Sequence, residues 1–199
     1  MPTTFPSPTQ NRQAAGLDSQ KTHLRALTRA SVSGLEIKET QAGAVRQSVL
    51  TLTNVNITIT RNGTTAVYGG LQLATFPEGV SSLLGGVANL TVTRGETTNM
   101  TATAPLVVAV GSVTASNNAT LSSTEADAVP STAFTLVAGT KASGGHLATA
   151  AIYDGHTTAR PVFLNIAGDN ATDQCVATGN SSVNVTGTIV LTWIQLGDY

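Results

Sequence analysis

Apolar and polar side chains alternate along the end of the chain, between Val183 and Leu196. Valine, isoleucine, leucine or tryptophan occurs at nearly every second position, and most of the residues between are threonine or asparagine. A period of two places one row of side chains on a buried face and the other toward solvent, as in a long half-buried β-strand. The pattern predicts such a strand, with a buried row made of Val183, Val185, Ile189, Leu191 and Trp193.

A second strand is predicted over residues 49–60, and its alternation changes phase near Asn54. Apolar residues occupy even-numbered positions before Asn54 and odd-numbered positions after it. Because successive side chains of a strand point to opposite faces, the phase change inverts which face is buried. We expect either a β-bulge near Asn54 or a strand that crosses from one sheet to another. The Asn62-Gly63 pair that follows predicts a hairpin turn.

The remaining apolar segments are short, and turn residues separate them. Glycine pairs and polar loops occur roughly every 8–12 residues, a spacing typical of all-β domains. In Pro105–Val110 the odd-numbered and the even-numbered positions are both apolar, which predicts a strand buried on two faces. We therefore expect an all-β fold over residues 35–199, an antiparallel β-sandwich of jelly-roll type. A closed barrel is the alternative that the pattern leaves open.

Residues 1–34 differ from the rest of the chain. Three prolines favour extended backbone at the start, and Leu17–Arg29 is compatible with a short helix that has one thin leucine stripe. Such a stripe cannot stabilise an isolated helix, so we expect an extended N-terminal arm that becomes ordered on a neighbouring molecule.

Charge separates the same two regions. Residues 1–34 carry a net charge of +3 and residues 35–199 carry −4, so a basic arm could reach an acidic neighbour. The basic residues that we expect to make partner contacts are Arg12, Lys21, Arg25 and Arg29.

Composition excludes several classes of function. Only 11% of the residues are charged, against about 25% in ordinary domains. No dense Lys/Arg run with interleaved aromatics occurs, so we expect no nucleic-acid partner. The first residues lack the features of a signal peptide and no segment approaches transmembrane length, so we expect synthesis in a cytoplasm and no membrane partner. Cys175 is the only cysteine; we interpret it as a small buried apolar residue.

Residues that carry out chemistry are sparse. The three histidines, His23, His146 and His156, do not have the spacing of metal ligands. The sequence contains no Gly-x-Ser-x-Gly elbow and no phosphate-binding glycine loop. We therefore expect no catalytic residue, no cofactor and no enzymatic activity.

An acidic pair and a tryptophan are further candidates for binding a ligand. Glu125 and Asp127 could hold calcium together with Asp154, Asp169 or Asp173, but no calcium motif supports this, and a solvated acidic loop is the favoured interpretation. Trp193 could serve as a carbohydrate platform, but its place in an apolar row favours packing in the core or at a contact between copies.

Several stretches resemble a group of tailed-bacteriophage virion proteins of the head decoration, or cement, type. Together they cover much of residues 48–198; residues 1–47 are not covered, and residues 94–106 are the least similar part of the remainder. The stretches are Val67–Gly70, Phe76–Gly79, Val113–Asp127 and Gly187–Asp198. The resemblance implies a β-sandwich bound to the outside of an icosahedral shell, commonly as a trimer, with no catalytic residues.

The expected function is therefore structural. We expect a virion protein on the outer capsid surface that bridges major capsid subunits, with the major capsid protein and further copies of itself, in a homotrimer, as partners. Trp193 joins the four arm residues as a candidate contact residue. A receptor- or glycan-binding tail or fibre module is the alternative, and a metal-dependent hydrolase of surface polysaccharide is less favoured.

Overall fold

The computed structural model describes residues 26–96, 99–101, 104–136, 140–143, 151–154, 160–170, 175–176 and 179–197. Most of these residues lie in β-strands, with one short 3-10 helix, η1. The elements are β1 (Thr28–Arg29), β2 (Leu35–Ala42), β3 (Val45–Asn62), β4 (Ala66–Thr75), β5 (Val80–Arg94), β6 (Pro105–Gly111), η1 (Ser123–Glu125), β7 (Val129–Thr135), β8 (Thr140–Ser143), β9 (Ala151–Asp154), β10 (Pro161–Asp169) and β11 (Ser181–Gly197).

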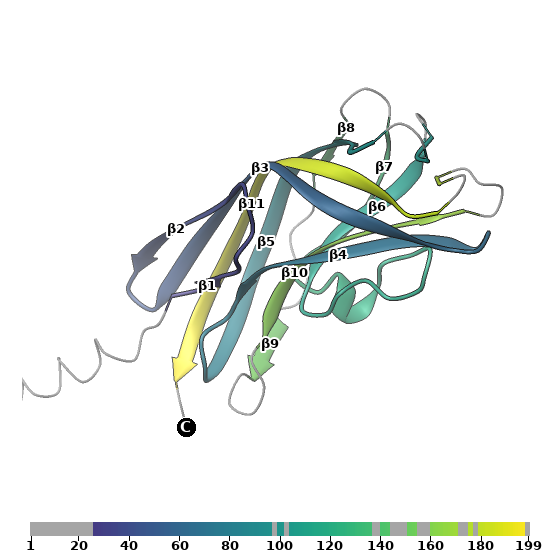
Figure 1. Ribbon diagram of the computed structural model, residues 1–199. Coiled ribbons are helices and arrows are strands. Elements are labelled where there is room, and N and C mark those ends of the chain that lie inside the picture. The colour runs from purple at the N-terminus through teal and green to yellow at the C-terminus, as the bar shows by residue number, and fades with distance from the viewer. Residues whose placement is uncertain are drawn as a thin grey trace, which may run out of the picture.

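All strand pairings are antiparallel, and eight of the strands follow one path, β7-β6-β10-β4-β3-β11-β5-β8. Off this path, β1 pairs with β4, β2 with β3 and β9 with β5. The two ends of the path, β7 and β8, lie next to each other, so the sheet is nearly closed into a barrel. Figure 1 shows β2, β3, β11 and β5 along one wall and β4, β10, β6 and β7 along the other.

The predicted all-β, antiparallel fold is confirmed, but the finer prediction of a jelly-roll sandwich is not. The physical reason lies in β3, which belongs to both walls. It pairs with β11 along most of its length and with β4 through its last three residues, 60–62. One strand therefore joins the two walls into a continuous sheet, as in the barrel alternative.

The predicted bulge is present at Asn54, and it keeps the same face of β3 buried although the alternation changes phase, since Leu52 and Val55 both lie in the core. Thr186 of β11 lies opposite two residues of β3, Thr53 and Asn54, in place of one. Asn54 has a φ of 53°, and its N–H donates to Thr186 Oγ1 over 3.0 Å. Both alternatives left open by the sequence thus occur in this one strand, a bulge and a passage between walls. The predicted hairpin is also present, with Asn62 opposite Ala66.

The predicted buried row of β11 is confirmed. Val183, Val185, Ile189, Leu191 and Trp193 all have 0% of their surface exposed. β11 is paired on both edges, with β3 and with β5, so one row faces the core while the other faces outward. The core that they enter also contains large side chains of β3, β5 and β10, among them Leu50, Ile57, Leu90 and Ile166.

β6 is buried on two faces, as predicted. Leu106, Val108 and Val110 point into the main core. On the other side Ala109 packs in a second cluster, the cover cluster, which is formed with Ala115, Leu121 and Ala167. Ala115 and Leu121 belong to residues 112–127, so this segment, the 112–127 loop, covers the outer face of β6 and β10.

The expected arm lies partly outside the described residues. Residues 1–25, which include most of the expected helix, are not described. Its last residues lie on the body: β1 pairs with Thr75 and Ala74 of β4, and the Ala30 N–H donates to the Leu73 carbonyl over 2.9 Å. The helix prediction is wrong for Thr28–Arg29, because β4 offers backbone partners that a thin leucine stripe cannot match.

Candidate functional site

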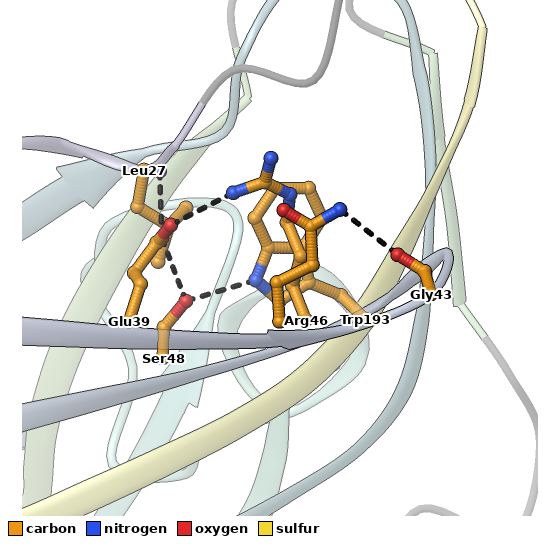
Figure 2. Close-up of polar contacts among 7 residues, drawn as sticks. Leu27, Glu39, Gly43, Arg46, Ser48 and Trp193 are labelled. Carbon is orange, nitrogen blue, oxygen red and sulfur yellow. Dashed lines mark hydrogen bonds and ion pairs between the residues drawn. The ribbon is translucent and has the colours of Figure 1, made fainter. Parts of the chain in front are cut away.

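Side chains from three neighbouring strands meet where the N-terminal segment joins the body. Glu39 of β2 lies opposite Ser48 of β3, and Arg46 of β3 lies opposite Trp193 of β11. These four residues and Leu27 form the arm-root cluster (Figure 2). Strand register alone brings them together, because residues opposite each other on adjacent strands share a face.

The Glu39 carboxylate is the centre of the cluster. Its Oε1 accepts hydrogen bonds from the Leu27 backbone N–H at 2.8 Å and from the Ser48 hydroxyl at 2.9 Å. Its Oε2 accepts from Arg46 Nη1 at 3.2 Å. Only 15% of the Glu39 side chain and 7% of the Arg46 side chain are exposed. Removing one partner of such an ion pair leaves the other as a poorly solvated charge, so the loss of either side chain destabilises the fold.

Trp193 connects this polar cluster to the core. Its Nε1–H donates to the Ser48 hydroxyl over 2.9 Å, and the Arg46 guanidinium lies 5.6 Å from the ring centroid, within cation–π range. The ring meets Phe76 edge to face at 5.4 Å. The predicted burial of Trp193 is confirmed. With no exposed surface, the ring cannot act as a carbohydrate platform or touch a partner in this conformation.

The arm-root cluster fixes the backbone just after the undescribed residues. Leu27 is 7% exposed, and its N–H is bound by a carboxylate that is itself held by two other side chains. Arg29, one of the predicted contact residues, is exposed, and its Nη1 donates to the Leu35 carbonyl over 2.8 Å. Three other predicted contact residues, Arg12, Lys21 and Arg25, lie outside the described residues. The cluster therefore holds the backbone at Leu27 against the body.

A second polar arrangement holds the 112–127 loop. Asn165 of β10 is fully buried, and its Oδ1 accepts from the Ala115 N–H over 2.8 Å. Its amide nitrogen donates to the carbonyls of Val113 and Glu125, both at 2.8 Å. One asparagine therefore satisfies three backbone groups of the loop and fixes its path over the sheet.

Glu125 contributes a buried carboxylate to the same loop. It accepts hydrogen bonds from the N–H groups of Ser116 at 2.6 Å and Ser122 at 3.3 Å. Burial raises the pKa of Glu125, but hydrogen bonds from Ser116 and Ser122 outweigh burial, so its pKa is lowered overall. Asp127 accepts from the N–H and hydroxyl of Ser112 at 2.8 and 2.7 Å.

The interpretation of Glu125 as part of a solvated acidic loop is wrong, because Glu125 is 6% exposed and bonded to its own loop. The alternative calcium site gains no support: within the described residues, no three His, Cys, Asp or Glu side chains lie close enough to hold a metal. Of its other proposed members, Asp169 is exposed, whereas the Asp154 side chain and all of Asp173 lie outside the description.

Cys175 is buried and unpaired, as predicted. Its Sγ–H donates to the carbonyls of Asp169 and Pro105 at 3.0 and 3.3 Å. Burial, with a smaller contribution from the Asp169 charge, raises the pKa of the thiol to about 11. The thiol is therefore protonated and unreactive at neutral pH. The three histidines lie outside the described residues.

The sequence analysis missed Glu39, Arg46, Ser48 and Asn165. A signal was present for the first three, because each occupies an inward position of an alternating strand. Glu39 continues the row of Leu35 and Ile37, and Arg46 and Ser48 precede Leu50 in the buried row of β3. A polar residue in an apolar row must find a partner inside the protein, and the identity of that partner depends on strand register.

No family model matches the chain, and no curated protein matches it. In the described part of the chain, no helix is long and apolar enough to cross a membrane. The arm-root cluster and the 112–127 loop are thus the features on which a functional proposal can rest.

Proposed function

We propose that this chain is a capsid decoration protein, which binds the outside of a phage head as a homotrimer and bridges major capsid subunits. The observation that carries the proposal is the anchoring of the N-terminal segment by the arm-root cluster. The antiparallel all-β character of the fold is established. The jelly-roll type of β-sandwich is part of the proposal.

An arm that ties neighbouring subunits together must transmit force to a folded body. Here the backbone at Leu27 is bound by Glu39, which is paired with Arg46 and joined through Ser48 to Trp193 in the core. Displacing the backbone at Leu27 would expose the Glu39–Arg46 pair and disturb the core beneath it. An extension without such contacts would detach at little cost in free energy. The cluster therefore suits an attachment point that has to resist force.

Charge and valency favour the same role. The arm carries a net charge of +3 on a body of −4, so its basic residues can contact an acidic surface of the shell or of a neighbouring copy. Three arms on one trimer would bind together, so modest affinity at each contact yields firm attachment through effective concentration. The shell is stabilised by mass action, with no chemical step.

A receptor- or glycan-binding tail module is the second candidate, and the 112–127 loop favours it. Buried Asn165 and Glu125 hold the loop, while Val113, Thr114, Asn117 and Asn118 are exposed on it. A rigid loop that presents amides and hydroxyls can bind a ligand without first becoming ordered. Copy number on purified virions separates the two functions: hundreds per particle support decoration, and tens or fewer support a tail module.

The anchoring role is tested with shells stripped of this protein. We expect that deleting residues 1–25 leaves the sheet folded by circular dichroism but weakens sedimentation with shells. Glu39→Gln, which removes the charge that accepts from the Leu27 N–H, should weaken sedimentation with shells partially. Glu36→Gln is the matched control, since Glu36 lies on the same strand in an ion pair with Lys38 whose side chains are 61% and 73% exposed.

Two results would contradict the proposal. Equally tight binding of the truncated protein and the full chain to stripped shells would remove the arm from the contact. Release of DNA from decorated and stripped particles at the same temperature would remove the stabilising role.

A further inference from the structure

The outer faces of β3, β11 and β5 form a wide surface on the side opposite the core. Four of the five large hydrophobic side chains that are exposed in the described chain belong to these strands: Val45, Leu84, Val87 and Leu196, with 38%, 37%, 49% and 43% exposed. Val49, Val190 and Ile194 are half-buried members of the same outward rows. We call this surface the outer valine face.

β11 resembles β6 in being apolar on both sides over part of its length. Between Ile189 and Leu196, Leu191 and Trp193 enter the core, while Val190 and Ile194 point outward. The outer side of β6 is covered by the 112–127 loop. The described part of the chain leaves Val87 and Leu196 exposed, so this face has no cover like that of β6 within the described residues.

The face is neutral at its centre and hollowed. Gln47, Leu84, Val87, Val190 and Thr192 surround a hollow of about 330 Å³ floored by Gly85 and Gly86. The outward positions of β3 and β11 within the described chain, and those of β5 from residue 84 to residue 93, carry no charged side chain. Charge appears on the neighbouring strand β2, where Lys38 pairs with Glu36. An apolar centre beside a charged margin is the anatomy of a protein interface.

We propose that the outer valine face is where copies of this chain contact one another. This inference rests on the proposed self-association and names its surface. β11 has 17 residues, so the face is about 55 Å long and about 14 Å wide at ordinary strand spacings. Roughly 800 Å² per copy is what a stable interface of standard size buries, and the apolar end of the face provides that area only together with its threonine- and asparagine-rich remainder.

A second copy fits this face better than a charged partner does. A charged surface would lose its hydration against the neutral centre without gaining a counter-charge. Neighbouring copies bring the same neutral rows, and around a three-fold axis the exposed Val87 and Leu84 of each copy can enter the hollow of the next.

The test compares one substitution at two equally exposed valines. Val87→Lys places a charge at the centre of the face, and Val113→Lys, at 45% exposed on the 112–127 loop, is the matched control. Light scattering on the wild type should give three times 20.2 kDa. We expect Val87→Lys to weaken self-association by about tenfold or more, with Val113→Lys unchanged. Thr192→Lys, on the rim of the hollow, repeats the test should Val87→Lys fail to fold.

The outcomes separate this inference from the proposed function. A wild-type monomer at all concentrations, or a folded Val87→Lys oligomer as stable as the wild type, overturns the inference. Retained oligomers that no longer bind stripped shells would assign the face to the capsid protein, which overturns the inference and leaves decoration standing. A low copy number on virions contradicts decoration, whatever the oligomer measurements show.

Discussion

The two walls of the barrel differ in what lies over their outer faces. On β6 and β10 the 112–127 loop supplies Ala115 and Leu121 to a second apolar cluster. On β3, β11 and β5 the outer side chains include Val87, which is 49% exposed. Both walls have strands that are apolar on two sides, yet the described part of the chain covers only one of them. The same local pattern therefore predicts burial without specifying what provides it.

The covered wall also shows what it takes to hold a loop against a sheet. A loop has backbone groups that a strand would pair, and burying them unpaired is costly. Asn165 and Glu125 provide those partners from inside the protein. The uncovered wall needs no such device, since threonine and asparagine share its outer rows with the valines. A partner can therefore be added to that wall without rearranging it.

The largest expected effect is on the inner side of the uncovered wall. Trp193→Ala should lower the free energy of unfolding by about 3–5 kcal/mol, since the side chain is fully buried and bonded to Ser48. Thr192→Ala, the outward neighbour, is the control and should change it by less than about 0.5 kcal/mol. Denaturant unfolding followed by circular dichroism measures both. Equal effects would mean that the inward and outward sides of β11 are wrongly assigned.

The next effect tests how the cover is held. Asn165→Ala strands the Ala115 N–H and the carbonyls of Val113 and Glu125, so we expect a loss of about 2–4 kcal/mol. Limited proteolysis should then cut within residues 112–127. Asn56→Ala removes an exposed amide pair with Asn184 and should cost less than about 0.5 kcal/mol. An uncut, fully stable Asn165→Ala protein would contradict the proposed anchoring.

A smaller effect compares the two outer faces directly. Leu121→Ala, in the cover cluster and 5% exposed, should cost about 2 kcal/mol. Val190→Ala, on the outer valine face, should cost less than about 0.5 kcal/mol when the protein is dilute enough to be monomeric. At concentrations that favour the oligomer, thermal melting should show a larger cost for Val190→Ala. A cost independent of concentration would contradict burial of Val190 between copies.

The smallest effect is the pH dependence of the cover. The pKa of Glu125 is lowered in the folded protein from an ordinary value of 4.5. Its contribution to stability is thus present above about pH 4.5 and is lost as pH falls through the folded pKa. Glu125→Gln should flatten this part of the stability curve, measured by denaturant unfolding between pH 2 and 6. An unchanged curve would mean that other carboxyl groups set the acid sensitivity.

Much of the fold could be predicted from local pattern. The alternation in β11, the phase change at Asn54 and the two-sided β6 each follow from side chains whose direction is fixed by strand geometry. The candidate sites could not be predicted in the same way. Glu39 and Ser48 are nine residues apart and Trp193 is 145 residues beyond Ser48, so only register brings them together. Arg12, Lys21 and Arg25 remain predictions.

The sequence by itself determined that this chain forms antiparallel strands, which of their rows are buried and where β3 bends, because these depend on near neighbours. Only the tertiary structure decided that β3 joins both walls, that Glu39 binds the backbone of Leu27, and that the 112–127 loop covers one wall and leaves the other open. Those outcomes depend on which distant strands pair. An apolar row is stabilised by any apolar surface that covers it. The pattern of the row therefore does not show which segment, or which molecule, provides that cover.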